Sequence, residues 1–151
     1  MARPKIHVQH FIACLNAAWD GAPGLQTLRT LERVGYWYSV PPDTEFPFEN
    51  LEFWVYARFY LVGSINGFRT FSLDVYWHDA PEGVRRIGGR SLGSVRFSDR
   101  HPVISSAWPV RPLIFPGTGQ YEFQLLVELN RPWGRESRPV RSEFIRIERQ
   151  P

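Results

Sequence analysis

Residues 51–78 read LEFWVYARFYLVGSINGFRTFSLDVYWH, and this stretch decides the fold. Mostly aliphatic or phenylalanine side chains alternate with polar or other aromatic side chains along 51–62 and again along 69–78. This is the two-residue period of a β-strand. Both segments are rich in the β-branched and aromatic residues that strands favour. A short turn containing Asn66 and Gly67 separates them. The pattern therefore predicts a β-hairpin.

The loop length sets the register of this predicted hairpin. A two-residue loop at Asn66 and Gly67 would place the aliphatic face of the first strand beside the polar face of the second. A slip of one residue turns every side chain to the other face. In that register neither face of the hairpin would be apolar on both strands, so neither could be buried as the core. A three-residue loop at 65–67, with a glycine bulge, would instead pair Phe59 with Leu73. The face that carries these two residues is the predicted core.

The opposite face of the predicted hairpin carries aromatic and charged side chains. Its members are Trp54, Tyr56, Arg58, Tyr60, Asp74, Tyr76 and His78. In the predicted register Tyr56 lies beside Tyr76 and Arg58 beside Asp74, and each such pair contributes about 0.2 to 1 kcal/mol. We take all seven as candidate binding residues, because contiguous apolar patches mark interaction sites. Alternatively, another part of the chain, such as 25–33 or 130–139, covers this face.

Further short strands are expected along the rest of the chain. They lie at 5–15, 84–97, 103–115, 119–129 and 140–148. Glycines in 84–97 and prolines in 103–115 are typical of edge or bulged strands. Residues 25–33 fit a helical face through their leucines, but their threonines and the following VGYWY run favour a strand, so a short helix is the alternative. About eight strands with frequent turns predict an all-β fold, an antiparallel β-sandwich.

Length and composition indicate a single domain, residues 1–151. The chain has 151 residues, of which 43% are hydrophobic, and a chain of this size buries roughly 70% of its unfolded surface. Its one cysteine, Cys14, excludes an internal disulfide framework. No apolar run approaches the roughly 20 residues that span a bilayer, and the first residues lack the apolar core of a signal peptide. We therefore expect a cytoplasmic protein.

The net charge of +3 is unevenly distributed. Residues 1–84 carry six basic and nine acidic side chains, whereas residues 85–151 carry twelve arginines and six acidic side chains. The arginines are interspersed with glutamates, and no recognised nucleic-acid motif is present. Both observations argue against a nucleic-acid partner.

The motifs of common catalytic and metal sites are absent from the sequence. It has no Gly-x-Ser-x-Gly elbow, phosphate-binding glycine loop, Cys-x-x-Cys or His-Glu-x-x-His. The acidic run from Asp43 to Glu52 matches no calcium loop. His7 and His10 lie three apart, which on a regular strand places them on opposite faces, so a shared metal would require a bulge. We expect no enzymatic activity, no metal and no cofactor.

Several segments carry a resemblance to a known family. They are Phe46-Pro47, Phe53 to Phe59, Val75 to Gly83 and FPGTGQYEFQL at 115–125. With them the chain resembles an uncharacterised family of small bacterial and phage β-sandwich proteins. The resemblance implies a fold of this kind and assigns no activity.

The sequence thus predicts a non-catalytic binding or assembly module that contacts a protein partner or a second copy of itself. The alternative is a β-sandwich that binds a glycan or small ligand on the same face, where Trp54 and Tyr56 would offer aromatic rings beside Arg58 and Asp74.

Overall fold

The computed structural model describes residues 5–14, 16–20, 27–32, 37–50, 53–63, 66–110 and 113–151, and within them it contains twelve β-strands and no helix. The strands are β1 (Lys5–Cys14), β2 (Asn16–Asp20), β3 (Thr27–Glu32), β4 (Trp37–Val40), β5 (Phe48–Asn50), β6 (Trp54–Val62), β7 (Gly67–Trp77), β8 (Arg85–Phe97), β9 (Val103–Pro109), β10 (Leu113–Phe115), β11 (Gly119–Arg131) and β12 (Gly134–Arg149). The all-β prediction is confirmed. Within 25–33 the described residues form β3, so the strand interpretation holds there and the helix alternative is wrong.

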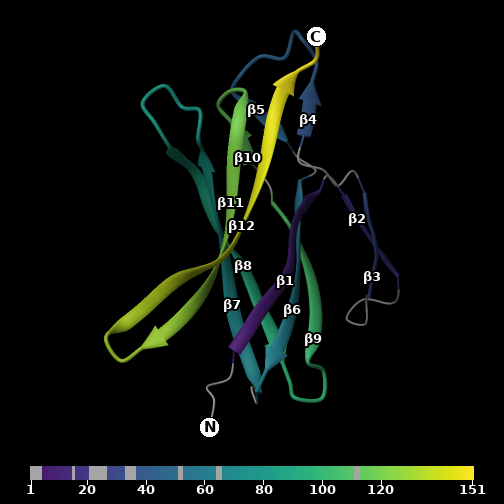
Figure 1. Ribbon diagram of the computed structural model, residues 1–151, viewed down its shortest axis with the longest axis vertical. Helices are drawn as coiled ribbons and strands as arrows, with labels where there is room; N and C mark the ends of the chain where they lie inside the picture. The colour runs from purple at the N-terminus through teal and green to yellow at the C-terminus, as the bar shows by residue number, and fades with distance from the viewer. Residues whose placement is uncertain are drawn as a thin grey trace.

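Two larger sheets organise the chain (Figure 1). One has three strands in the order β1-β6-β9, and the other has five in the order β4-β12-β11-β7-β8. Two small pairs, β10-β5 and β2-β3, accompany them. The five-stranded sheet is mixed, because β4 runs parallel to β12. The strand count and this parallel pair both differ from the expected antiparallel arrangement of about eight strands.

The predicted hairpin over 51–78 is wrong. β6 lies between β1 and β9, while β7 lies between β11 and β8, so the two strands belong to different sheets. The turn around Asn66 carries the chain from one sheet to the other. The predicted pairs across that hairpin are therefore absent. Alternation specifies which face of a strand is buried, but it does not specify the neighbouring strand.

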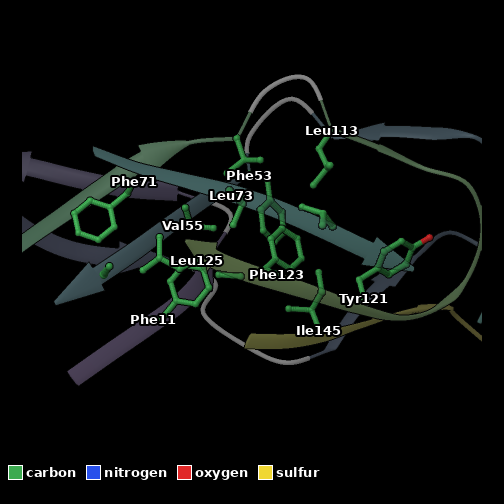
Figure 2. Close-up of a cluster of buried hydrophobic side chains, with 14 of the residues drawn as sticks. Phe11, Phe53, Val55, Phe71, Leu73, Leu113, Tyr121, Phe123, Leu125 and Ile145 are labelled. Atoms are coloured by element: carbon green, nitrogen blue, oxygen red, sulfur yellow. The ribbon is translucent and has the colours of Figure 1, made fainter. Parts of the chain in front are cut away.

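The predicted core faces are nevertheless confirmed. Phe59 on β6 is fully buried, Phe71 on β7 is 1% exposed, and their ring centroids lie 4.7 Å apart. Phe53 stacks on Phe123 of β11 with centroids 5.1 Å apart (Figure 2). Burying each such side chain contributes about 1.5 to 3 kcal/mol. The inner faces of β6 and β7 thus pack against each other across one hydrophobic core. In the predicted hairpin the two strands would instead be hydrogen-bonded neighbours in one sheet.

A bulge in β1 changes which of its side chains face the core. The pairing with β6 shifts between Val8 and His10, which leaves one extra residue in β1. His7 lies opposite Tyr60 and His10 opposite Arg58, so both histidines lie on the outer face. The prediction that they occupy opposite faces is wrong for this reason. Among the described residues, however, no group of three histidine, cysteine, aspartate or glutamate side chains could hold a metal ion.

The turn that leads into β11 packs against the end of β7. The hydroxyl of Tyr121 donates to the carbonyl oxygen of Gly117, four residues upstream, as in a tyrosine corner. The indole of Trp77 donates to the carbonyl oxygen of Thr118 over 3.1 Å and stacks on the Tyr121 ring. These contacts fix one end of the five-stranded sheet.

Beyond Val127, β12 is the partner of β11 among the described strands, and the two strands project as an arm (Figure 1). The arm comprises residues 128–137 and its turn carries Trp133, which is 79% exposed. The described part of the chain contains no helix with the length and apolar character that crossing a membrane requires.

Candidate functional site

The structure separates the seven candidate residues onto two faces. Trp54, Tyr56, Arg58 and Tyr60 lie on the outward face of β6, whereas Asp74, Tyr76 and His78 lie on the outward face of the five-stranded sheet. Because the inner faces of β6 and β7 meet in the core, these two groups point to opposite sides of the molecule. The predicted single patch therefore does not exist as one surface.

The β6 group contributes one exposed aromatic ring. Tyr60 is 40% exposed and lies opposite His7 and Val103 on the neighbouring strands. The hydroxyl of Tyr56 is hydrogen bonded to the hydroxyl of Ser105 over 3.0 Å. This outer face thus presents Tyr60 and Val103 beside the exposed Arg58.

The other group belongs to a larger surface on the five-stranded sheet. The strand register places Arg86, Tyr76, Glu122 and Phe144 in one row across β8, β7, β11 and β12. We call this surface the polar-aromatic face and define it by Trp37, Asp74, Tyr76, His78, Arg86, Glu122, Ser142 and Phe144. Its side chains come from all five strands and from the residue that follows β7.

Asp74 anchors one half of the polar-aromatic face. Arg86 donates to its Oδ1 through Nη2 at 2.8 Å and through Nε at 3.2 Å, and the Tyr76 hydroxyl donates over a long 3.5 Å to its Oδ2. Gly89 makes room for this ion pair, since a Cβ atom there would collide with the Arg86 guanidinium and the Asp74 carboxylate. Burial, and secondly the Asp74 charge, raises the pKa of Tyr76. Tyr76 is therefore a neutral phenol at physiological pH.

Glu122 anchors the other half. Nε2 of His78 lies 3.0 Å from Oε1 of Glu122, and the Ser142 hydroxyl donates to Oε2 over 2.7 Å. The His78 ring also packs edge to face on Phe144. Here the carboxylate stands between the hydroxyl and the imidazole, whereas a nucleophilic triad requires the imidazole to contact the hydroxyl. The arrangement fixes side chains in place and does not activate Ser142.

Two exposed aromatic side chains complete this surface. Trp37 on β4 is 71% exposed and lies opposite Arg146, and Phe144 is 40% exposed. Neither was among the sequence candidates. A signal for both was available, because Trp37 alternates with the inward-facing Tyr38 and Val40, and Phe144 precedes the buried Ile145. An aromatic residue at the outward position of a strand is the pattern that identifies them.

The polar-aromatic face offers aromatic rings, arginine and phenol donors, and carboxylate acceptors that are already hydrogen bonded to one another. Such a surface is suited to binding by stacking and hydrogen bonding. No protein-family model matches the sequence, and a comparison with curated proteins finds no match. The family resemblance noted from the sequence stays an expectation.

Proposed function

We propose that this protein is a non-catalytic binding module of the cytoplasm, and that a partner protein or a second copy binds its polar-aromatic face. The observation that carries the proposal is the combination of exposed Trp37 and Phe144 with a fixed polar network on one sheet surface. Tryptophan, tyrosine and arginine dominate the binding energy of protein interfaces.

The dimensions of this surface favour a protein partner. Five strands spaced about 4.8 Å apart span about 19 Å, which is the scale of a standard interface of about 800 Å² per partner. The carboxylates of Asp74 and Glu122 already have hydrogen-bond donors within the chain. Their burial by a partner would therefore leave neither carboxylate without a hydrogen-bond donor, and Asp74 would keep its ion pair with Arg86.

In architecture, we propose a β-sandwich in which the three-stranded sheet packs on the mixed five-stranded sheet. The close approach of Phe59 and Phe71 across the core supports this description. The binding surface is then the solvent side of one layer, and the core supports it from beneath.

A glycan is the second candidate ligand, because the ring of Trp37 is 71% exposed and lies on the same face as carboxylates and arginines. Sugar rings stack on such aromatic faces, and their hydroxyls bond to such groups. A sugar library should then change tryptophan fluorescence in the wild type and leave it unchanged in Trp37→Phe. Silence of the wild type across the library would remove this candidate.

Matched surface variants test the proposal. One variant combines Trp37→Ser with Phe144→Ser, and the control combines Tyr60→Ser with Val103→Ser on the outer face of the three-stranded sheet. Wild type and both variants carry an affinity tag and are purified from cells of the organism that produces the protein. The proteins that co-purify, including untagged copies of this chain, are quantified by mass spectrometry. The proposal expects at least one protein to be lost from the first variant and retained by the control. Loss from the control alone would contradict it.

A further inference from the structure

A groove of 420 Å³ lies apart from the polar-aromatic face, between β1 and the base of the β11-β12 arm. Its apolar lining comes from both sheets: Ile6, Val8, Phe71, Val127, Leu129 and Val140. Phe71 is buried beneath it, whereas Ile6, Val8 and Val127 are only partly covered by the core. Apolar side chains in an open groove favour an occupant that brings apolar groups of its own.

The charged side chains of the groove are all basic. Lys5, Arg69 and Arg138 line it together with His7, and no acidic residue among those that the structure describes does. Within the part of the chain that the structure describes, no carboxylate forms an ion pair with Lys5, Arg69 or Arg138. An acidic occupant would therefore meet at least three cationic groups without displacing an existing ion pair.

The edge of β1 forms one wall of the groove. Four consecutive residues, 5–8, line it. Because successive side chains of a strand point to opposite faces, a lining by consecutive residues means that the groove follows the strand's edge. Among the described strands, β1 pairs only with β6. Its other edge thus offers backbone donors and acceptors to an added strand.

We propose that this groove binds an extended segment of a partner protein in which apolar and acidic residues alternate, and that the segment pairs with the open edge of β1. In an added strand the side chains alternate between two directions. One set then enters the apolar groove, and the carboxylates of the other set lie on the outer side of β1, beside Lys5 and His7. Arg69 and Arg138 lie on the inward side with Phe71 and Val127, where they keep the potential of the groove positive. This site is separate from the polar-aromatic face and does not depend on its function.

The test uses three blocked peptides labelled with fluorescein and measures their binding by fluorescence anisotropy. The first alternates valine and glutamate, the second alternates valine and lysine, and the third has the composition of the first in two blocks. The proposal expects the first peptide to bind, the second not to bind, and the third to bind about tenfold more weakly. Laurate is tested beside the peptides as a fatty-acid probe. Binding of laurate without binding of the first peptide would identify a fatty-acid site and overturn the proposal, as would binding of none of these probes.

Two further measurements identify the site. Lys5 is exposed, and Lys5→Glu should weaken binding of the first peptide about tenfold, whereas Arg85→Glu, the same charge change at the end of the β7-β8 pair away from Arg69, should not. Bound peptide should also slow hydrogen exchange at the amides of residues 5–8. Equal affinity in wild type and Lys5→Glu, or binding without protection of 5–8, would overturn the proposal.

Discussion

The imidazole of His78 packs edge to face on the ring of Phe144, with the ring centroids 5.7 Å apart. The same imidazole lies 3.0 Å from Glu122, so two different strands hold it. Phe144 is thereby fixed against a polar group while 40% of its surface stays exposed. A partner that covers Phe144 meets a preorganised ring and loses little side-chain entropy on binding.

Phe144→Ala should weaken partner binding about tenfold or more, because an exposed aromatic on a fixed network is the kind of residue that dominates interfaces. The free energy of unfolding should fall by only about 1 kcal/mol, since the lost contact is one edge-to-face pair. The measurements are a binding titration with the partner and urea unfolding. Tyr60→Ala is the matched control, because Tyr60 is also 40% exposed and lies on the opposite side of the molecule. Equal loss of binding in both variants would contradict the assignment.

Gly89→Ala and Gly88→Ala should differ in their effects on stability. A Cβ atom at Gly89 would displace the Arg86 guanidinium from Asp74, whereas one at Gly88 would make an ordinary 3.7 Å contact with Leu113. The partly exposed ion pair is worth about 1 kcal/mol or less, and alanine in a strand gains about 0.5 to 1 kcal/mol over glycine. Urea unfolding should therefore show Gly88→Ala at or above wild-type stability and Gly89→Ala below Gly88→Ala. The reverse order would mean that the ion pair does not form.

Tyr121 should make the protein less stable in alkali. Burial raises the pKa of Tyr121 from 10.0 to about 12. Between these two values the unfolded chain loses the phenolic proton and the folded chain keeps it, so the free energy of unfolding falls with rising pH, by about 3 kcal/mol in total. At neutral pH this contribution is fully present.

Tyr121→Phe removes this pH dependence. It should cost about 1 kcal/mol at neutral pH, where the hydrogen bond to Gly117 is lost. The free energy of unfolding in urea is measured for Tyr121→Phe, for wild type and for the exposed control Tyr60→Phe. Each is measured at neutral pH and at a pH above the pKa of a free tyrosine. An alkaline loss of stability as steep in Tyr121→Phe as in wild type would show that another group is responsible.

Asn66 should stabilise the two connections in which the chain passes between the sheets. Its amide nitrogen donates to Oδ2 of Asp99 over 3.0 Å, and the backbone amide of Asp99 donates to Oδ1 of Asn66 over 3.3 Å. Asn66→Ala should lower the free energy of unfolding by about 1 kcal/mol. Asn66→Asp should lower it further, because two carboxylates would then meet, and salt should recover part of this difference. A salt-independent difference between the variants would rule out the charge repulsion.

Much of the fold could be predicted from the sequence, because the alternation of side chains indicates which face of each strand is buried. That period alone predicts Phe59 and Leu73 in the core, and both are buried. The glycines of 84–97 indicated an edge or bulged strand, and β8 is both. The partner of each strand was not predictable in this way. A turn at Asn66 fits a hairpin and a crossover equally well locally, and the choice depends on distant strands.

The candidate site shows the same limit. The candidates Asp74, Tyr76 and His78 do lie on one surface. The other four, Trp54, Tyr56, Arg58 and Tyr60, lie on the opposite side. The alternation in β4 and β12 indicates that Trp37 and Phe144 point outward. It does not place Trp37 on this surface, because β4 joins the sheet through a parallel contact of four residues with β12 that no short-range pattern indicates. His10 was misplaced because a single extra residue in β1 reverses the alternation.

The most direct test of the polar-aromatic face is site-specific photo-crosslinking in the cells that encode the chain. The photoreactive residue p-benzoylphenylalanine replaces Phe144 in one variant and Ser105, on the outer face of the three-stranded sheet, in another. The proposal predicts discrete adducts from position 144, identified by mass spectrometry as a partner or a second copy, and none of these from position 105. Adducts from position 105 alone, or from neither position, would contradict it.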